Sequence, residues 1–460
     1  MLTLHRRDLT AFRTVFRRCR PTRAPDPNLL LRVTAAGTSL RFLSTTPDAT
    51  LGYTRDIEHR GDDLDWCLPG AVLDVAEQTV TDTFELHPLG KTRVRVRWPG
   101  GEHEFELAKA NRPAWPDGPD RWGQADGLLL TALHEAGRTA DRSPGRWASH
   151  RVQLQGDAGR VVGTDTKQAL IWDGFRFPFT ESVRVPAVAA FGSKEWKREA
   201  VRVGRTKSHV VFAVGPWTLG LTVDPSGKFP DATAIVPKAQ TPTVVHLSED
   251  DARLAMSRLG AVPDDADDTN AVTLDAMEGG VAVRWRLGDD KPPNELRLPG
   301  SRCTGPAVRY AFDRQYLLRG LALGFRTLKV CGAHRPLAMT DRHRLYLAAG
   351  HDPSTAIPPD DAVHTSGPKA SLSISPIVLR SQPPNPEPPM PIPPTRTGPP
   401  PDDDTTPDPL AEAEAVRDLL AEAAQRANQL VQMLKAKRKA DRAITQAVRS
   451  LRALPLGGGT

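Results

Sequence analysis

The chain has 460 residues, which is enough for about three domains. Its composition, 39% hydrophobic and 25% charged, is that of a globular protein, and its net charge of +6 favours an anionic partner such as nucleic acid. The first twenty residues lack the apolar core of a secretory signal, and no run of about 18 apolar residues predicts a membrane span. Four widely spaced cysteines without a C-x-x-C pair make a disulfide framework unexpected and predict a reducing, intracellular compartment.

The first third of the sequence combines two helical segments with short strands. Apolar residues at helical spacing predict helices over 9–18 and 70–79. Alternating apolar residues predict strands over 28–33, 39–45, 51–57, 92–98 and 103–107. A segment rich in Pro, Gly and Trp at 112–123 then interrupts the pattern.

The same order of helix, strands, helix and strands recurs twice more. The second cycle has predicted helices at 127–137 and near 187–196, and strands at 152–155, 160–164, 169–172, 200–203, 209–214 and 217–223. The third has predicted helices at 249–259 and 314–323, and strands at 271–275, 280–286, 327–331 and 344–348. We therefore predict an α+β protein with three consecutive domains, each with two helices packed on antiparallel sheets, at 1–122, 123–243 and 244–350.

The C-terminal region differs from this body. Eighteen of the 43 prolines lie between Pro353 and Pro409, so 351–409 is predicted to be a disordered, Pro-rich linker. Over 410–454 the apolar residues repeat at about 3.5-residue spacing, which predicts an amphipathic helix or a coiled coil. A basic block at 435–439 is explained by a solvated helix face or by a phosphate contact.

No catalytic motif stands out in the sequence. Phosphate-binding glycine loops, H-E-x-x-H and G-x-S-x-G are all missing. Cys331 and His334 are three residues apart, but such a lone pair is more often structural than a metal site. The aspartate clusters at 62–65 and 264–268 fit solvated loops better than cation sites. We therefore expect no enzyme activity, no metal and no cofactor.

Four segments, in order along the chain, resemble the bacterial DNA polymerase III β subunit, the sliding clamp. The resemblance covers roughly residues 1–350. They are RPTRAPDPNLLLRV at 20–33, RVVGTDTKQALIW at 160–172, GKFPDATAIVPK at 227–238 and YLLRGLALGFRTLKV at 316–330. The sequence is thereby identified as a divergent member of that family with an added C-terminal tail.

The resemblance implies three DNA-clamp domains and a head-to-tail homodimer that encircles double-stranded DNA without reading its sequence. Such a clamp confers processivity on a DNA polymerase, is opened by a clamp loader, and works in the cytoplasm on the nucleoid. The alternative is a clamp-fold scaffold or paralogue that oligomerises through its C-terminal helix, whose partner is unknown, and does not encircle DNA.

The resemblance also implies which residues face the DNA. A sliding ring needs cations that contact phosphates rather than side chains that read bases. Surface solubility is the alternative explanation for any one of these cations. The implied DNA-binding residues are Arg13, Arg17, Arg20, Arg23, Arg146, Trp147, Lys167, Lys194 and Lys197.

A pocket for partner peptides is implied between the second and third domains, where Phe229 and Pro230 would form an apolar wall. The chain departs from the family here: Ala234 stands for an arginine, and Leu347 lies in a replaced C-terminal ending. The family's Thr-Asp-Gly-His-Arg-Leu keeps only its first two residues, at 164–169. The implied pocket residues are Thr164, Thr166, Ala169, Phe229, Pro230, Ile235 and Leu347. The implied dimer interface brings Phe105 and Leu107 of one chain to Ala261 and Val262 of the other.

Overall fold

The structure is a computed structural model. It describes residues 1–20, 27–34, 39–57, 63–79, 81–115, 117–145, 147–197, 199–225, 227–264, 270–278, 280–288, 291–359 and 364–365. These residues lie in one compact unit, Met1–Ser373. The predicted helix over 410–454, most of the linker, Arg23 and Arg146 lie outside the described residues.

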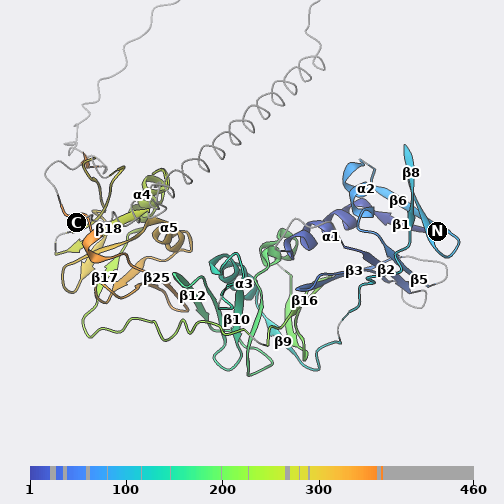
Figure 1. The fold of residues 1–460 in the computed structure, drawn as a ribbon, viewed down its shortest axis with the longest axis horizontal. Coiled ribbons are helices and arrows are strands. Elements are labelled where there is room, and N and C mark those ends of the chain that lie inside the picture. Colours follow the sequence, from blue (N-terminus) through green and yellow to red (C-terminus); the bar gives the residue numbers. More distant parts are fainter. Residues whose placement is uncertain are drawn as a thin grey trace, which may run out of the picture. The chain divides into compact units, whose positions relative to one another are not determined.

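The described strands form four sheets (Figure 1). The first sheet uses strands of the first predicted repeat alone, and the last sheet uses strands of the third repeat and of the segment after it; each repeat is called a third below. The first sheet has the order β1 (Leu2–His5), β6 (Thr83–Leu89), β7 (Arg93–Trp98) and β8 (Gly101–Glu106). The last sheet has the order β22 (Val308–Asp313), β18 (Ala271–Met277), β19 (Gly280–Trp285), β20 (Asn294–Arg297) and β26 (His364–Thr365). The β20–β26 pair is parallel, whereas the other pairs in both sheets are antiparallel.

The two longer sheets each join strands from neighbouring thirds. The eight-stranded sheet has the order β5 (Leu64–Leu68), β2 (Leu29–Thr34), β3 (Ser39–Thr45), β4 (Ala49–Asp56), β16 (Trp217–Thr222), β15 (His209–Val214), β14 (Val201–Arg205) and β9 (Trp122–Ala125). The nine-stranded sheet has the order β13 (Ser182–Pro186), β10 (Arg151–Gln155), β11 (Arg160–Thr164), β12 (Gln168–Asp173), β25 (Arg344–Ala348), β24 (Leu337–Thr340), β23 (Thr327–Val330), β17 (Thr243–His246) and β21 (Arg302–Thr304).

The two long sheets are joined in the same way. In each third, the helix near its start is followed by three successive strands, and the last of these is β4, β12 or β20. The final strand of each third is β8, β16 or β25. β4 pairs antiparallel with β16, and β12 pairs antiparallel with β25. The predicted threefold repeat is therefore visible in the topology.

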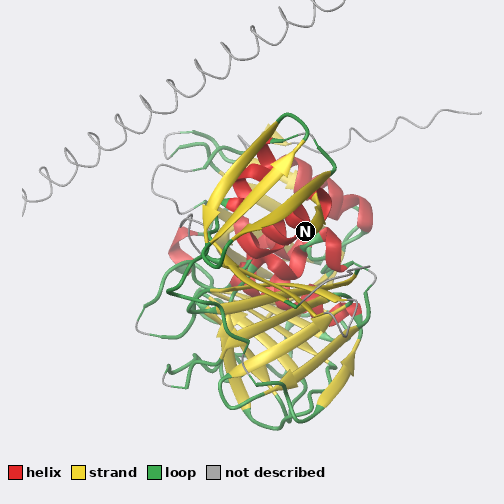
Figure 2. Cartoon of the chain, turned by 90° about the vertical axis from the view of Figure 1, so that its right-hand side faces the viewer, coloured by secondary structure: helices red, strands yellow, loops and turns green. Residues whose placement is uncertain are grey.

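Five α-helices cover these sheets in the described chain: α1 (Arg6–Arg18), α2 (Val72–Gln78), α3 (Gly127–Thr139), α4 (Glu249–Gly260) and α5 (Arg314–Ala322) (Figure 2). Their apolar faces enter one large core, in which Phe12 and Phe16 of α1 are completely buried. Side-chain caps at Asp126, Ser248 and Asp313 satisfy first-turn amides of α3, α4 and α5.

The predicted helix near 187–196 is wrong. Two short 3₁₀ turns, η1 (Ala189–Gly192) and η2 (Lys194–Trp196), occupy this position. Gly192 lies so close to α3 that a Cβ atom there would be 2.6 Å from the His134 ring. Trp196 is buried at the end of the segment. Tertiary packing against α3 therefore replaces a regular helix, and two α-helices are present only in the first and third repeats.

The sequence patterns missed several short strands. These are β1, β5, β6, β9, β13, β17, β20, β21, β22, β24 and β26. Many are three to five residues long, and several alternate with charged side chains, so their apolar signal is weak. The predicted break at 112–123 contains the first residues of β9, which completes the eight-stranded sheet through β14.

Close packing of α3 on the nine-stranded sheet requires glycine at position 163. A Cβ atom on Gly163 in β11 would lie 2.1 Å from the backbone oxygen of Ala136 in α3. We expect Gly163→Ala to lower the free energy of unfolding by about 1–3 kcal/mol, because the helix must move off the sheet. Denaturant unfolding checks this, with Gly118→Ala as the control because a Cβ atom there has nothing within 4 Å. Equal stability of the two variants would contradict the proposed helix–sheet contact.

Candidate functional site

The helices and turns form a continuous layer across all three thirds of the chain. α1 contacts α2 and η1, η1 contacts α3, and α4 contacts α5. Arg319 of α5 links to α3, since its guanidinium donates to the Glu135 carbonyl at 3.1 Å and lies 2.5 Å from the Glu135 carboxylate. A single surface of helices and turns is therefore available to one extended partner.

Arg13, predicted to contact DNA, is instead a structural residue. Its side chain is only 4% exposed, and its guanidinium donates to the Leu73 carbonyl at 3.0 Å. It also forms ion pairs with Asp74 and, at 2.7 Å, with Glu77. The prediction failed because these acidic partners come from α2, about 60 residues away in the sequence.

The other described residues that were predicted to face DNA lie in several different elements. Arg17 is half exposed but is paired with Glu77 at 3.1 Å, and the Arg20 guanidinium lies 5.6 Å from the centre of the Phe16 ring. Lys194 begins η2 and Lys197 follows it; both are exposed and have no ion pair within the described part of the chain. Lys167 is exposed in the β11–β12 hairpin, and Trp147 is 39% exposed.

The predicted peptide pocket corresponds to an apolar cluster at the junction of β12 and β25. Ala169 and Leu347 are directly opposite each other in the sheet, are buried, and pack with Phe229. Pro230 is half-buried beside Phe229, whereas Ile235 is 50% exposed. The buried hydroxyl group of Thr164 donates to the Gln168 carbonyl at 2.6 Å, and Thr166 is exposed with a φ of 75°. The structure thus gathers Ala169, Phe229 and Leu347 but not the complete predicted set.

The predicted dimer interface needs correction at Phe105. This side chain points into the core and is 7% exposed, and Leu107 also packs against the core. The outward-facing side chains of β8 are charged or polar. A second chain would therefore pair with this edge through backbone hydrogen bonds, not through apolar side chains. Ala261 is exposed at the end of α4, and the Val262 carbonyl accepts a hydrogen bond from Arg314 at 2.7 Å.

The segment 351–359, predicted as linker, packs on the last sheet. His351 donates its backbone N–H to Ala311 of β22 at 2.8 Å, and the N–H of buried Ile357 donates to Thr273 of β18 at 2.9 Å. The short turn η3 (Pro353–Thr355) lies between them, and β26 pairs with β20 beyond. Ordered contacts therefore extend past the predicted end of the third domain at 350.

A buried ion network lies within the same sheet. Arg284 pairs with Asp275 and, at 2.7 Å, with Glu295, and the three side chains are each no more than 6% exposed. Burial acts to raise the pKa of Glu295, but hydrogen bonds from Arg297 and Arg284 outweigh it and hold that pKa below its ordinary value. The carboxylates of the network are paired with arginines, and no group of three potential metal ligands occurs among the described residues.

No family model matches the sequence, and no curated protein matches it. Solved structures, however, share the fold. The DNA polymerase sliding clamp of Pseudomonas aeruginosa has a TM-score of 0.65 at 16% identity, covering 76% of this chain and 99% of its own. The Helicobacter pylori β clamp bound to a DNA ligase peptide gives 0.63 at 13% identity, covering 76% and 99%. The DNA polymerase III β subunit of Thermotoga maritima gives 0.62 at 14%, covering 76% and 98%. The chain therefore has the sliding-clamp fold.

No helix in the described part of the chain is long and apolar enough to cross a membrane.

Proposed function

We propose that this protein is a divergent sliding clamp that encircles duplex DNA as a head-to-tail dimer and tethers a DNA polymerase. Its three repeats, at about 1–122, 123–243 and 244–350, serve as clamp domains, and it performs no catalysis. It acts in the cytoplasm on the nucleoid and relies on a clamp loader for opening. The observation that carries this proposal is that neighbouring repeats are joined by strand pairing, β4 with β16 and β12 with β25. We call each of these pairings a joint.

The same pairing rule supports a way in which a second copy would close the ring. β4 pairs with β16 and β12 pairs with β25, so the same rule matches β20 with a β8 strand. β8 ends its own sheet, and β20 has only the short β26 beyond it. Since β8 of the same chain belongs to the first repeat, a second copy would supply it, and two such pairings would close a ring in which neither β8 nor β20 keeps an unpaired edge. The interface strand in the third repeat is then β20, with Ala261 and Val262 playing no direct part.

β26 lies along the edge that this pairing requires. Its two residues pair with Asn294 and Glu295 of β20. A second copy must therefore displace β26, and the chain's own strand competes with dimer formation. This competition gives the segment after the third repeat a direct influence on ring closure.

Inside the ring, exposed cations of the helix layer would contact phosphates. We assign this role to Arg17, Arg20, Lys194 and Lys197, and include Lys167, Trp147, Arg23 and Arg146 by their positions in the sequence. Partner peptides would dock beside Phe229, Pro230, Ala169 and Leu347, with Thr164, Thr166 and Ile235 at the rim.

The test is retention on circular DNA. Protein dissociated by dilution is concentrated with a closed plasmid, washed at about 0.5 M salt, and then treated with a restriction enzyme. We expect retention that survives salt and ends on linearisation, because a topological link does not depend on counterion release. Release by salt alone, or retention on linear DNA, would favour the scaffold function instead.

Variants that lack two lysine charges distinguish direct contact with DNA phosphates from encirclement of the DNA. Lys194→Gln with Lys197→Gln is expected to reduce the salt slope of low-salt DNA binding by about 1.8, because two phosphate contacts are lost. The double variant should still be retained on circular DNA. An unchanged slope would exclude these lysines from the DNA-facing set.

A further inference from the structure

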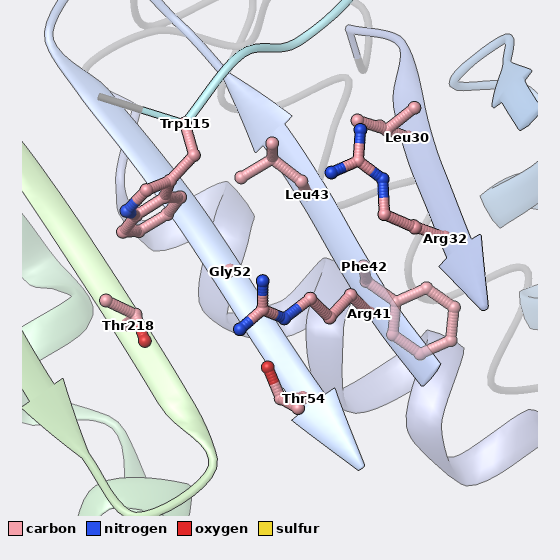
Figure 3. Close-up of a pocket in the computed structure, with 9 residues that line it drawn as sticks. All are labelled: Leu30, Arg32, Arg41, Phe42, Leu43, Gly52, Thr54, Trp115 and Thr218. Atoms are coloured by element: carbon pink, nitrogen blue, oxygen red, sulfur yellow. The ribbon is translucent and has the colours of Figure 1, made fainter. Parts of the chain in front are cut away.

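A small pocket lies on the face of the eight-stranded sheet that points away from the helices, at the joint between β4 and β16 (Figure 3). Its volume is about 160 Å³. The opposite face of the same strands enters the main core through Leu31 and Phe42. This pocket therefore lies apart from both the DNA-facing layer and the predicted peptide site.

The strand register explains the two halves of the pocket. Leu30, Leu43 and Gly52 lie opposite one another on β2, β3 and β4, and this row is apolar. In the adjacent row Arg32 lies opposite Arg41, and Arg41 lies opposite Thr54. An apolar row thus runs directly beside a cationic one.

Trp115 forms the wall on the other side. Its indole ring packs over Gly52, where a Cβ atom would lie 3.2 Å from the ring. In Figure 3 the ring stands over β4, facing Leu43 and the end of the Arg41 side chain. Trp115 remains 37% exposed, so the pocket is bounded by an aromatic ring but open to solvent.

The rim carries an excess of positive charge. Arg32 pairs with Asp65 at 3.5 Å, and Arg112 pairs with the same carboxylate. Arg41 is exposed and has no ion-pair partner among the residues that the structure describes. Two positive charges remain after Asp65 is counted, so the rim complements an anionic group.

The matching joint between β12 and β25 is covered differently. There the connecting segment lays Ala232 onto the sheet, with Phe229 and Val236 beside it, over Ile171 and Leu347. At the β4–β16 joint, the corresponding connection contributes Trp115 over Gly52 and Ala108 over Leu30 and Leu43. The space between these two contacts is the pocket.

We propose that this pocket binds a peptide of a partner protein in which a bulky apolar side chain is flanked by acidic residues. The apolar side chain would lie between Trp115 and Leu43, and a carboxylate would accept hydrogen bonds from Arg41 and Arg32. The volume is well below the roughly 300–1,000 Å³ of small-molecule sites, so it suits one side chain of a peptide. The clamp would then hold two partners at two different joints.

The test is a fluorescence anisotropy titration of the full chain with fluorescein-labelled Gly-Glu-Glu-Leu-Gly-Gly. We expect saturable binding that falls about tenfold in Arg41→Gln, because a charge-assisted hydrogen bond is lost. Gly52→Val should weaken binding at least as much, since the added side chain displaces Trp115. Arg176→Gln is the matched control, because it removes an exposed arginine elsewhere and should bind as the wild type does.

Two altered peptides test the chemistry from the other side. Replacing the leucine with alanine, or both glutamates with glutamine, should each weaken binding about tenfold, and the glutamine peptide should no longer distinguish Arg41→Gln from wild type. The proposal is overturned if the wild type does not bind, if the alanine peptide binds equally well, or if Arg41→Gln and Gly52→Val have no effect.

Competition by oligo(dT) equal to that by peptide would assign the site to nucleic acid instead. Binding only by residues 1–373, the compact unit, would assign it to the chain's own C-terminal segment.

Discussion

Glu104→Pro in β8 is expected to convert the proposed dimer largely to monomer. The Leu107 N–H donates to the Thr92 carbonyl at 2.8 Å, and the β7–β8 register places Glu104 opposite Arg95. Because hydrogen-bonded pairs alternate along antiparallel strands, the backbone N–H of Glu104 points away from β7 toward the free edge. Proline removes that donor and leaves the β7–β8 ladder intact.

Glu104→Ala is the matched control for this prediction. Both substitutions remove the carboxylate that pairs with Arg93 and Arg95, but only proline removes the edge N–H. Light scattering across a dilution series should show a dimer dissociation constant about tenfold or more higher for the proline variant than for the alanine variant. Equal dimerisation of the two variants would exclude β8 as the closing edge.

A disulfide between β26 and β20 would block the edge of β20 that the proposed dimer needs. The substitutions Asn294→Cys and His364→Cys, in a background carrying Cys303→Ser and Cys331→Ser, place two thiols at paired positions of β20 and β26. A disulfide there should keep the full chain monomeric, and reduction should restore the dimer. A dimer that persists under oxidising conditions would show that β26 does not compete with ring closure.

Arg284→Met is expected to destabilise the last sheet by about 3–5 kcal/mol at neutral pH. The substitution leaves Asp275 and Glu295 buried without their shared cation, and an unpaired buried charge is costly. Because the three repeats need not unfold together, the measurement is hydrogen exchange of peptides covering 271–297. Arg297→Ala is the control, since Arg297 pairs with the same Glu295 but is 69% exposed and should cost less than about 1 kcal/mol.

The effect of Arg284→Met should depend on pH. In the wild type the folded-state pKa of Glu295 is held below its ordinary value, so its stabilising contribution is present at neutral pH and is lost as the pH falls through that folded pKa. Without Arg284, burial raises the pKa and protonation relieves the cost. The difference between wild type and variant should therefore shrink steadily as the pH falls from 7 toward the ordinary carboxyl pKa of about 4. A difference that is constant from pH 7 to pH 4 would mean that packing, not charge, explains it.

Local patterns predicted much of the secondary structure. The helices over 9–18, 127–137, 249–259 and 314–323 correspond to α1, α3, α4 and α5, because each has an amphipathic period that depends only on neighbouring residues. The segment 187–196 has a comparable composition but forms 3₁₀ turns. Its conformation depends on the contact of Gly192 with His134, which no local pattern records.

The candidate site was predicted less completely for the same reason. Position in the sequence suggested both Arg13 and Lys194 as DNA contacts, yet Arg13 is buried against α2 and Lys194 is exposed. The pocket beside Trp115 was missed altogether, although PAWP in the break at 112–123 was a visible signal for a fixed aromatic side chain. Its partners Leu43 and Gly52 lie more than 60 residues earlier.

The sequence by itself determined the threefold order of helices and strands, the faces of the main helices and the lack of a catalytic motif, since these depend on residue type and near-neighbour spacing. Only the tertiary structure decided which strands join the repeats, which arginines form ion pairs within the protein, and which sheet edges a second copy could pair with. Those properties depend on groups that are distant along the chain and meet only when the sheets assemble. The pairing of β4 with β16 and of β12 with β25, from which ring closure is inferred, is of this second kind.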